Sequence, residues 1–373
     1  MVDPEADIIG SFHPDVVVDA ILAKKNLGTR ITDAPFVIGV GPGFYAGKDC
    51  HCVIETKRGH TLGNVIWEKE AIPNTGVPGN IGGFTTERLI RASADGIMEP
   101  VAEIGDTVEK GQLVARTGKQ PVYAKMSGIV RGMLQKDVQV TEGLKIGDID
   151  ARCEPEHCVT ISDKARAVGG GVLEAVSLFG QIYGNYGVAL LAAGEAKRFG
   201  SDKLSEKFQG IPLYRHALEK LEAFSGLSRV VVTAREALAE EAQRLGIHIV
   251  ENRQPEQGIS HSVSLALQEL LSQNPDLEGV LFLVCDQPGI QAATIQKILN
   301  EGCLHKNSIV CAGYDGMRGN PVLWGSTYFQ ELMHLTGDTG GRQLMKQYEE
   351  KIRIVECAPE ELKDIDRRED MTE

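Results

Sequence analysis

At 373 residues the chain is too long for one ordinary hydrophobic core and suits two domains, with room for a subdomain. A composition of 42% hydrophobic and 24% charged residues is that of a soluble globular protein. The net charge of −13 argues against broad nucleic-acid binding, which depends on clustered Lys and Arg, although a local cationic pocket can still hold a nucleotide-sized anion.

The N-terminus and the cysteines indicate a compartment. No stretch approaches the roughly 18 consecutive apolar residues of a membrane span, and "MVDPEADIIGSFHPD" is acidic where a secretory signal is basic and then apolar. Eight cysteines in a chain of this length lack the density of a small secreted scaffold, so most are expected to be reduced thiols. We therefore expect a cytoplasmic protein without a membrane partner.

Residues 1–91 are rich in Gly and Pro, with short β-like runs such as "PFVIGV" and "HCVIET" between turns. We expect a separate accessory region here. Its polar residues among the glycines suit an anion or a metallocofactor, with solvated loop charge as the alternative: Lys24, Lys25, Glu55, Arg58 and His60.

Two cysteine-rich stretches leave a soft-metal site open. "CHC" (50–52) and "CEPEHC" (153–158) together supply four Cys and two His. Neither has the C-x-x-C spacing of a structural zinc site. Whether Cys50, Cys52, Cys153 and Cys158 bind a metal is therefore left undecided.

Residues 92–150 are short apolar runs punctuated by Gly-Asp, Lys-Gly and Ser-Gly, which predicts an all-β unit of tight turns. The runs Gly105–Leu113 and Ser127–Val130 resemble the two halves of the lipoyl/biotinyl barrel-sandwich family. Lys125 immediately precedes the second half instead of lying at a hairpin tip, so we expect it to be unmodified. With its linker this unit is assigned to residues 92–175, and "GGG" at 169–171 is expected to be a flexible joint.

From Tyr186 onward, strand and helix patterns alternate. Strands are expected at 187–194, 228–234, 247–252, 279–285 and 308–313, and helices at 212–224, 235–246, 260–271 and 292–302. This order predicts a Rossmann-like α/β domain, residues 183–373, with a mostly parallel sheet and helices on both faces. Ligands of such a sheet bind beyond the carboxyl ends of its strands, so the residues that follow each strand are the candidates for chemistry.

The first of these strands runs into "AAGEAKRFGSDK" (192–203), which fits neither a P-loop nor a dinucleotide fingerprint. The small-residue turn Ala192-Ala193-Gly194 can present amides to an anion, and Arg198 and Lys203 can neutralise charge. A triphosphate, with about four negative charges, suits two cations and a metal. A surface loop with incidental basic residues is the alternative.

The pattern "L-A-A-G-x-x-x-R-F-G-x-x-K" resembles the MobA-like NTP transferases that act on molybdenum cofactor, and in particular their cytidylyltransferase branch. The resemblance implies catalytic roles for Arg198 and Lys203 and nucleotide contacts from Ala192, Ala193 and Gly194. It also implies CTP as the substrate, since Ala193 stands where the guanylyl branch has glycine. GTP stays open.

Two aspartates are candidates for a Mg²⁺ site. Asp286 in "CDQP" directly follows a buried strand, where a hard carboxylate can hold Mg²⁺ against phosphates; an ordinary turn residue is the alternative. The resemblance gives the second carboxylate as Asp366, because "KDIDRRED" is similar to "D-I-D-T-P-E-D". Arg367-Arg368 replaces Thr-Pro here and could bring positive charge near the ion, and a solvated charged tail is the alternative.

The same resemblance implies the remaining site residues. Asn252, Gly258 and Ser262 match the loop and helix start that cradle base and ribose, with a helix N-cap by Ser260 as the alternative. "RGNPVLW" (318–324) and "LTGDTGGRQLM" (335–345) match the acceptor side of the cleft. The substrate-binding residues implied there are Asn320, Asp338 and Arg342, although Arg342 could be a helix-surface charge.

The N-terminal half resembles the YqeB-type accessory proteins of selenium-dependent molybdenum hydroxylases. The matching segments are Val16–Thr29, Asp33–Asp49, Val53–Ile66, "PNTGVPG" and the barrel-sandwich stretch. The usual Gly-rich N-terminal segment of that family is expected to be missing, since the sequence starts in the middle of the pattern.

These readings combine into one hypothesis, a molybdenum-cofactor maturation protein. Its C-terminal domain would carry out Mg²⁺-dependent nucleotidyl transfer from CTP (or GTP) to the molybdopterin phosphate, releasing pyrophosphate. Its expected partners are nucleotide, pterin cofactor and a molybdenum hydroxylase apoenzyme, with no nucleic acid. A non-catalytic cofactor-binding or delivery protein, and a nucleotidyltransferase for a sugar phosphate, are the alternatives.

Overall fold

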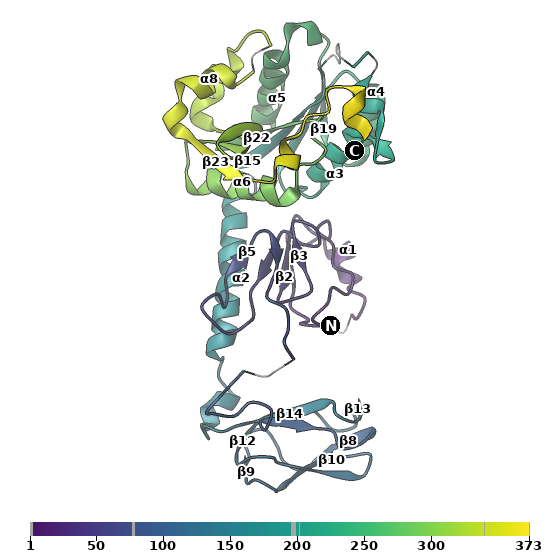
Figure 1. Cartoon of the computed structure of the whole chain (residues 1–373), viewed down its shortest axis with the longest axis vertical. Coiled ribbons are helices and arrows are strands. Elements are labelled where there is room, and N and C mark those ends of the chain that lie inside the picture. Colours follow the sequence, from purple (N-terminus) through teal and green to yellow (C-terminus); the bar gives the residue numbers. More distant parts are fainter. Residues whose placement is uncertain (1–2, 77–78, 195–198, 201, 339, 373) are drawn as a thin grey trace. The chain divides into compact units, whose positions relative to one another are not determined.

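The computed structural model describes residues 3–76, 79–194, 199–200, 202–338 and 340–372 (Figure 1). Contacts divide the chain into two compact units. Unit 1 comprises Met1–Thr56, Gly63–Ile72 and Gly170–Glu373, and unit 2 comprises Lys57–Leu62 and Pro73–Gly169.

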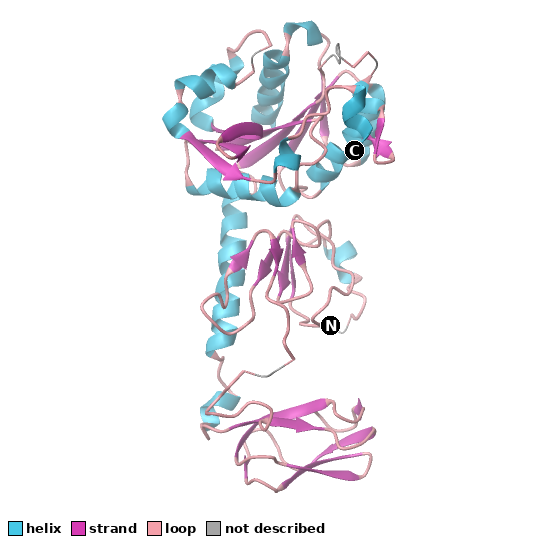
Figure 2. Cartoon of the chain, viewed as in Figure 1, coloured by secondary structure: helices cyan, strands magenta, loops and turns pink. Residues whose placement is uncertain are grey.

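Unit 2 contains two four-stranded sheets around one apolar core (Figure 2). One has the order β11-β10-β8-β13, the other β7-β14-β12-β9, and all the paired strands are antiparallel. The β-rich region expected from the sequence is confirmed. Its strands are β7 (Leu89–Arg91), β8 (Gly96–Pro100), β9 (Thr107–Val108), β10 (Leu113–Thr117), β11 (Gln120–Tyr123), β12 (Gly128–Met133), β13 (Gln139–Val140) and β14 (Lys145–Asp150).

Lys125 lies in an exposed bend between β11 and β12. The two-residue hairpin tip of this unit is instead Gly118-Lys119, because Thr117 pairs with Gln120. Both tip residues have positive φ, 53° and 71°, as a hairpin turn that follows the strand twist requires.

Helix α2 (Asp163–Ile182) includes Gly169–Gly171, where we expected a flexible joint, and the division between the two units falls between Gly169 and Gly170. The glycine at 171 has a packing reason: a Cβ added to it would lie 2.0 Å from the carbonyl oxygen of Gly63. A larger residue at 171 would push α2 away from that backbone. Gly170 has open space around it and no such constraint.

The N-terminal part of unit 1 is a small sheet of order β1-β2-β4-β5, in which β1, β2 and β4 are parallel and β5 is antiparallel. β3 and β6 form a separate antiparallel pair. The elements are α1 (Ile8–Phe12), β1 (Val16–Asp19), β2 (Phe36–Val40), β3 (Tyr45–Ala46), β4 (Cys52–Ile54), β5 (Val65–Ile66) and β6 (Lys69–Glu70).

The C-terminal part of unit 1 is built on a seven-stranded sheet of order β19-β18-β15-β20-β22-β21-β23. Neighbouring strands are parallel except where β22 is one of the pair, which confirms the mostly parallel sheet. Its strands are β15 (Tyr186–Leu191), β18 (Ser228–Thr233), β19 (His248–Glu251), β20 (Gly279–Val284), β21 (Ile309–Tyr314), β22 (Met317–Gly325) and β23 (Ile352–Glu356). A small hairpin pairs β16 (Lys207–Phe208) with β17 (Ile211–Pro212).

Strand β22 was expected only as a segment shaping the cleft. It forms because Asp315-Gly316 makes a two-residue turn with φ of 49° and 77°, which returns the chain antiparallel to β21. Its apolar half, Pro321–Gly325, is buried. The Asp-Gly pair is a hairpin signal that the sequence offered.

Helices cover both faces of this sheet, as predicted, and alternate residues of β15 show why (Figure 1). Val188 and Leu190 pack in one apolar cluster, while Ala189 packs in the other. The first cluster contains α3 (Leu213–Glu222), α4 (Glu236–Arg244) and α6 (Ala292–Leu304). The second contains α5 (Ile259–Gln273), α7 (Phe329–Met333) and α8 (Arg342–Gln347).

Short 3₁₀ helices complete the described chain: η1 (Pro155–Cys158), η2 (Lys203–Ser205), η3 (Pro255–Gln257), η4 (Ser326–Tyr328), η5 (Glu349–Lys351), η6 (Pro359–Leu362) and η7 (Arg368–Thr372). A bilayer-spanning helix, long and apolar enough for the purpose, does not occur among the residues that the structure describes.

Candidate functional site

A cavity of about 580 Å³ opens where β15 and β20 end. This is the carboxyl edge of the parallel strands, where α/β sheets bind their ligands, and the volume suits a nucleotide-sized molecule. The residues predicted from the sequence that line it are Ala192, Ala193, Gly194, Lys203, Gly258, Ser262, Asp286, Asp338 and Asp366.

Lys203 is the most deeply placed charge of this cavity. It begins η2 and is 8% exposed. Its Nζ donates to Asp286 Oδ2 at 2.9 Å and lies 3.6 Å from Asp366 Oδ1. Asp286 stands two residues past the end of β20, and Asp366 comes from the C-terminal segment. One ammonium group is therefore shared by two carboxylates 80 residues apart in the sequence, since 366 minus 286 is 80.

The C-terminal segment is attached to the sheet edge by its backbone. The amide of Ile365 donates to the carbonyl of Asp286 at 2.9 Å, and the Ile365 side chain is buried in the core. This contact places the residue that follows, Asp366, beside the cavity.

Asp364 is a third carboxylate near the pair, and the sequence analysis missed it. Gln287 Nε2 donates to its Oδ1 at 2.8 Å. Burial, and then the negative charge of Asp286, raise the pKa of Asp364. The repeated aspartate in "KDID" was the available signal, because residues two apart on an extended segment share a side.

The basic pair that departs from the family pattern lies outside the cavity lining. The guanidinium group of Arg368 lies 5.8 Å from the centre of the Phe199 ring and within ion-pair distance, 3.7 Å, of Glu206 Oε1. The positive charge of Arg368 is thus engaged by its own neighbours, and its side chain is 70% exposed.

The cavity offers two of the ligands that a divalent cation needs. Asp286 and Asp366 offer hard carboxylate oxygens to one cavity, as Mg²⁺ or Mn²⁺ prefers. Among the described residues, no group of three or more His, Cys, Asp or Glu side chains is arranged to hold a metal. Two protein carboxylates are nevertheless the usual share for Mg²⁺ in phosphate chemistry, where substrate oxygens and water complete the shell.

The turn after β15 is held by a residue that the sequence analysis did not single out. Arg235, just after β18, donates from Nη1 to the carbonyl of Ala192 at 2.6 Å and from Nη2 to that of Gly194 at 3.1 Å. Its Nε donates to Asp202 Oδ1 at 2.6 Å. Burial would raise the pKa of Asp202, but hydrogen bonds from Ser205 and Arg235 outweigh it and the pKa is lowered. Arg198 lies outside the described residues.

The start of α5 forms another wall. Gly258 has φ of 84°, and a Cβ there would lie 2.6 Å from the carbonyl oxygen of Gly337. The amide of Ile259 donates to Asp338 Oδ1 at 3.3 Å. Gly258 precedes the first helical residue, so the alternative that Ser260 is the N-cap is wrong. The Ser260 hydroxyl is buried and has no hydrogen-bond partner among the residues that the structure describes.

Asn252 stands behind this wall and is fully buried. Its Nδ2 donates to Ser262 Oγ at 3.0 Å, and its Oδ1 accepts from the amide of Gln254 at 2.9 Å. Asn252 therefore fixes the orientation of Ser262 and does not itself line the cavity.

Asn320 and Arg342 are not among the residues that line the cavity. Asn320 lies within β22, and Arg342 is an exposed residue at the start of α8. Their expected contacts with the acceptor remain predictions.

The "CHC" stretch has a structural explanation. The amide of Val37 donates to His51 Nδ1 at 3.0 Å, so Nε2 carries the proton and donates to the carbonyl of Ala223 at 2.6 Å. Burial lowers the pKa of His51 to about 4 and raises that of the Cys50 thiol to about 12. Both ring nitrogens are thus engaged, and the imidazole is a neutral part of the core.

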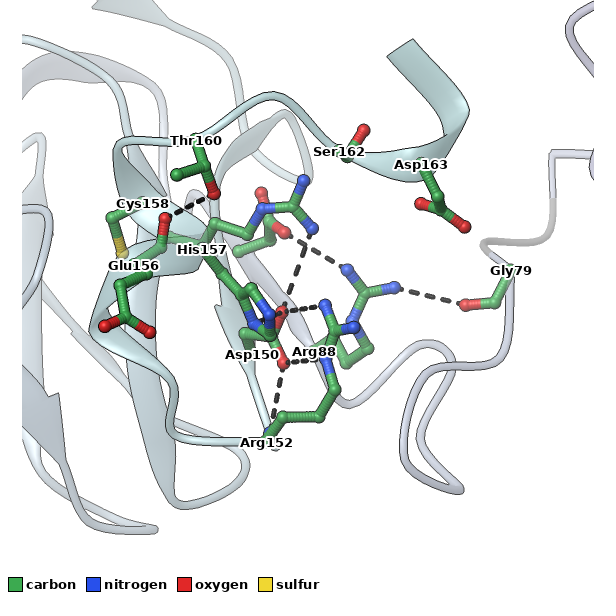
Figure 3. Close-up of polar contacts among 12 residues, drawn as sticks. Gly79, Arg88, Asp150, Arg152, Glu156, His157, Cys158, Thr160, Ser162 and Asp163 are labelled. Carbon is green, nitrogen blue, oxygen red and sulfur yellow. Dashed lines mark hydrogen bonds and ion pairs between the residues drawn. The ribbon is translucent and has the colours of Figure 1, made fainter. Parts of the chain in front are cut away.

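A second polar cluster lies in unit 2, around the end of β14 (Figure 3). Asp150 is 1% exposed and accepts from Arg152 Nε at 2.9 Å and Nη2 at 2.6 Å. Hydrogen bonds from Arg152 lower the pKa of Asp150 to about 2. Arg88 donates to Asp148 Oδ2 at 3.2 Å and to the carbonyl of Gly79 at 3.1 Å. These contacts attach the chain segments before and after the β-rich unit, at Gly79 and Arg152, to Arg88 and to Asp150 of β14.

The candidate anion-binding residues of the N-terminal region belong to both units: Lys24, Lys25 and Glu55 to unit 1, Arg58 and His60 to unit 2. Glu55 is buried and accepts from the amide of Ile72 at 2.9 Å. Arg58 pairs with Asp163, with hydrogen bonds of 2.6 and 2.8 Å. Lys24, Lys25 and His60 are exposed.

Comparison with known proteins gives separate matches for the two halves. Residues 188–352 match the family model described as "MobA-like NTP transferase domain". The N-terminal half is similar to "Uncharacterized protein YqeB" of Escherichia coli (strain K12), which is 54% identical over 178 residues. That match covers 48% of this chain and 33% of YqeB, so the chain spans about a third of the length of this relative.

Two further relatives are more distant. "Purine catabolism protein PucB" of Bacillus subtilis (strain 168) is 28% identical over 168 residues, which cover 42% of this chain and 78% of PucB. A "Probable molybdenum cofactor guanylyltransferase" of Thermococcus gammatolerans is 37% identical over 62 residues, 17% of this chain and 32% of that protein.

Proposed function

We propose, from the premise that residues 188–352 form a MobA-like NTP transferase domain, that this chain transfers the nucleotidyl group of CTP to the phosphate of molybdopterin and releases pyrophosphate. The observation that carries the proposal is the Lys203 ammonium shared by Asp286 and Asp366 in the cavity beyond β15 and β20. A relative named as a probable molybdenum cofactor guanylyltransferase supports the choice of acceptor. Ala193, at the position where the guanylyl branch has glycine, supports CTP.

The reaction forms one bond and breaks one. A phosphate oxygen of the acceptor attacks the α-phosphorus of CTP, and the bond from that phosphorus to the oxygen bridging to the β-phosphate breaks. Pyrophosphate leaves with the bonding electron pair. Such a transfer depends on alignment and charge neutralisation and needs no covalent nucleophile from the protein.

The residues divide these tasks. Lys203, with Arg198 by resemblance, neutralises the phosphates, and the turn Ala192–Gly194 presents its backbone to them. Gly258 and Ser262, backed by Asn252, receive base and ribose. Asp286 and Asp366 would hold Mg²⁺, which supplies Lewis-acid stabilisation of the charge at the transferring phosphate. Asn320, Asp338 and Arg342 would contact the acceptor.

The N-terminal half is proposed to be an accessory module for selenium-dependent molybdenum hydroxylases, with the hydroxylase apoenzyme as its partner. The 54% identity to YqeB supports a shared role for this half. The cytoplasmic location, and the absence of a nucleic-acid or membrane partner, are part of the same proposal.

Pyrophosphate release tests the function. The protein would be mixed with Mg²⁺ and CTP, GTP or ATP, with and without molybdopterin or a sugar phosphate. We expect release with CTP and molybdopterin together and with no other pair. Pyrophosphate release with a sugar phosphate would show that the acceptor is a sugar phosphate instead of molybdopterin. No release with any pair, from folded protein, would leave the non-catalytic delivery role.

A further inference from the structure

Arg235 holds both ends of the segment that follows β15. This segment, residues 192–203, begins with the turn Ala192–Gly194 and ends at Lys203. The guanidinium group donates to the carbonyls of Ala192 and Gly194 at one end, at 2.6 and 3.1 Å. At the other end it donates to Asp202 at 2.6 Å. One planar group thereby links the turn Ala192–Gly194 to Asp202.

The Arg235 side chain is itself fixed by its surroundings. Its backbone amide donates to Thr233 Oγ1 at 3.0 Å, and β18, which it follows, lies next to β15 in the sheet. Asp202 is fixed too, because its second oxygen accepts from the Ser205 hydroxyl at 2.5 Å. Arginine suits this position because its fork of donors reaches several acceptors in one plane, which a lysine ammonium does not.

The contacts set the direction of the backbone in the turn. A trans peptide points its carbonyl and its N–H to opposite sides. Because the Ala192 carbonyl points to Arg235, the N–H of Ala193 points away from Arg235. Ala192, Ala193 and Gly194 line the cavity, whereas Arg235 does not. At the other end, Asp202 immediately precedes Lys203, so the same guanidinium group also fixes the root of the ammonium-bearing side chain.

We infer that Arg235 is a positioning residue for the triphosphate, acting through the turn Ala192–Gly194 and through Asp202 without touching the nucleotide. This inference rests on the proposed function, since it assigns the loop to phosphate binding. A residue that positions only the turn Ala192–Gly194 and Lys203 affects triphosphate binding and leaves monophosphate binding nearly unchanged. This selectivity separates positioning from general support of the fold.

The test compares nucleotide affinities of Arg235→Gln with the intact chain by isothermal titration calorimetry in Mg²⁺. CTP and GTP are each measured beside their monophosphates. We expect the preferred triphosphate to bind Arg235→Gln about tenfold more weakly, which is about 1.4 kcal/mol. The monophosphate should change its affinity by less than about twofold, since it lacks the additional phosphates that the turn Ala192–Gly194 and Lys203 would bind.

Two further variants control for an unspecific effect of removing an arginine and for misfolding of Arg235→Gln. Arg244→Gln removes an arginine of the same domain whose side chain is 76% exposed, and it should bind both nucleotides normally. Asp202→Asn weakens the contact between Arg235 and residue 202. It should lower triphosphate affinity and leave monophosphate affinity nearly unchanged, even if Arg235→Gln folds poorly. Added guanidinium ion should partly restore triphosphate affinity to Arg235→Gln.

The outcomes are distinct. If the intact chain binds neither triphosphate, the proposed function fails and this inference fails with it. If the intact chain binds but Arg235→Gln and Asp202→Asn keep its triphosphate affinity, or weaken triphosphate and monophosphate equally, the inference alone is overturned.

Discussion

Replacing Lys203 with methionine tests two consequences of its position between Asp286 and Asp366: competition with a divalent ion and support of turnover. The substitution keeps the length of the side chain and removes its charge. Without nucleotide, the ammonium group is the cation that Asp286 and Asp366 share, at 2.9 and 3.6 Å. A divalent ion entering the same place must displace it. We therefore expect Lys203→Met to bind Mn²⁺ more tightly in the absence of nucleotide, and to lose turnover.

The distances bound the size of the effect. Even at the dielectric constant of water, about 80, Coulomb's law gives about 1.4 kcal/mol for the pair at 2.9 Å and about 1.2 kcal/mol for the pair at 3.6 Å. Lys203 is only 11% exposed at its side chain, so the effective dielectric constant is lower and the energies are larger. Mn²⁺ affinity should rise at least about tenfold. Turnover should fall about 100-fold or more, the usual result of removing one preorganised charge partner.

Electron paramagnetic resonance of free Mn²⁺ during a titration measures the affinity directly. Lys207→Met is the matched control, because Lys207 is an exposed lysine of the same domain, on β16. It should leave both Mn²⁺ affinity and turnover unchanged. If Lys203→Met binds Mn²⁺ no more tightly than the intact chain, the assignment of a shared metal and ammonium position is refuted.

Three further predictions concern other parts of the chain. Asp286→Ala should abolish pyrophosphate release while the circular dichroism spectrum stays unchanged; near-normal turnover would remove Asp286 from the metal site. Because burial lowers the pKa of His51 from 6.5 to about 4, its contribution to stability is complete above pH 6.5 and is lost as pH falls toward 4. Urea unfolding should therefore show an added loss approaching about 3 kcal/mol over that window, absent from His51→Gln. Gly171→Ala should lower the free energy of unfolding by about 1–3 kcal/mol, since its Cβ meets the Gly63 carbonyl, whereas Gly170→Ala, in open space, should raise it by about 0.5–1 kcal/mol; equal effects of the two would contradict the packing argument.

Sequence patterning was sufficient for the C-terminal architecture because its strands and helices are local signals. Buried apolar runs and amphipathic periods predicted β15, β18, β20 and the helices between them. The Asp315-Gly316 turn is a local signal that β22 pairs with β21, but the pairing of β22 with β20 is long-range and has no local signal. Of the three glycines at 169–171, Gly171 has a packing reason, its close approach to the Gly63 carbonyl, which only the tertiary structure reveals.

The site residues, too, include some that local sequence patterns predict and others that only tertiary contacts reveal. Lys203, Asp286 and Asp366 could be grouped from the sequence by resemblance, and they do meet in one cavity. Arg235 could not, because nothing in "TARE" states which loop lies beside it, whereas the repeated aspartate in "KDID" was a usable signal for Asp364. Their contacts arise where separate strand ends converge on one edge of the sheet. A residue that acts across such a junction leaves no local spacing in the sequence.

The fate of the CTP phosphates distinguishes nucleotidyl transfer to the pterin from simple hydrolysis. CTP labelled with ³²P at the α-phosphate, and separately at the γ-phosphate, would be incubated with Mg²⁺, molybdopterin and the intact chain. We expect the α-label to appear in a pterin dinucleotide and the γ-label in pyrophosphate, with neither transfer in Asp286→Ala. An α-label that stays in CTP or passes only to free CMP, with the protein folded, would contradict nucleotidyl transfer to the pterin.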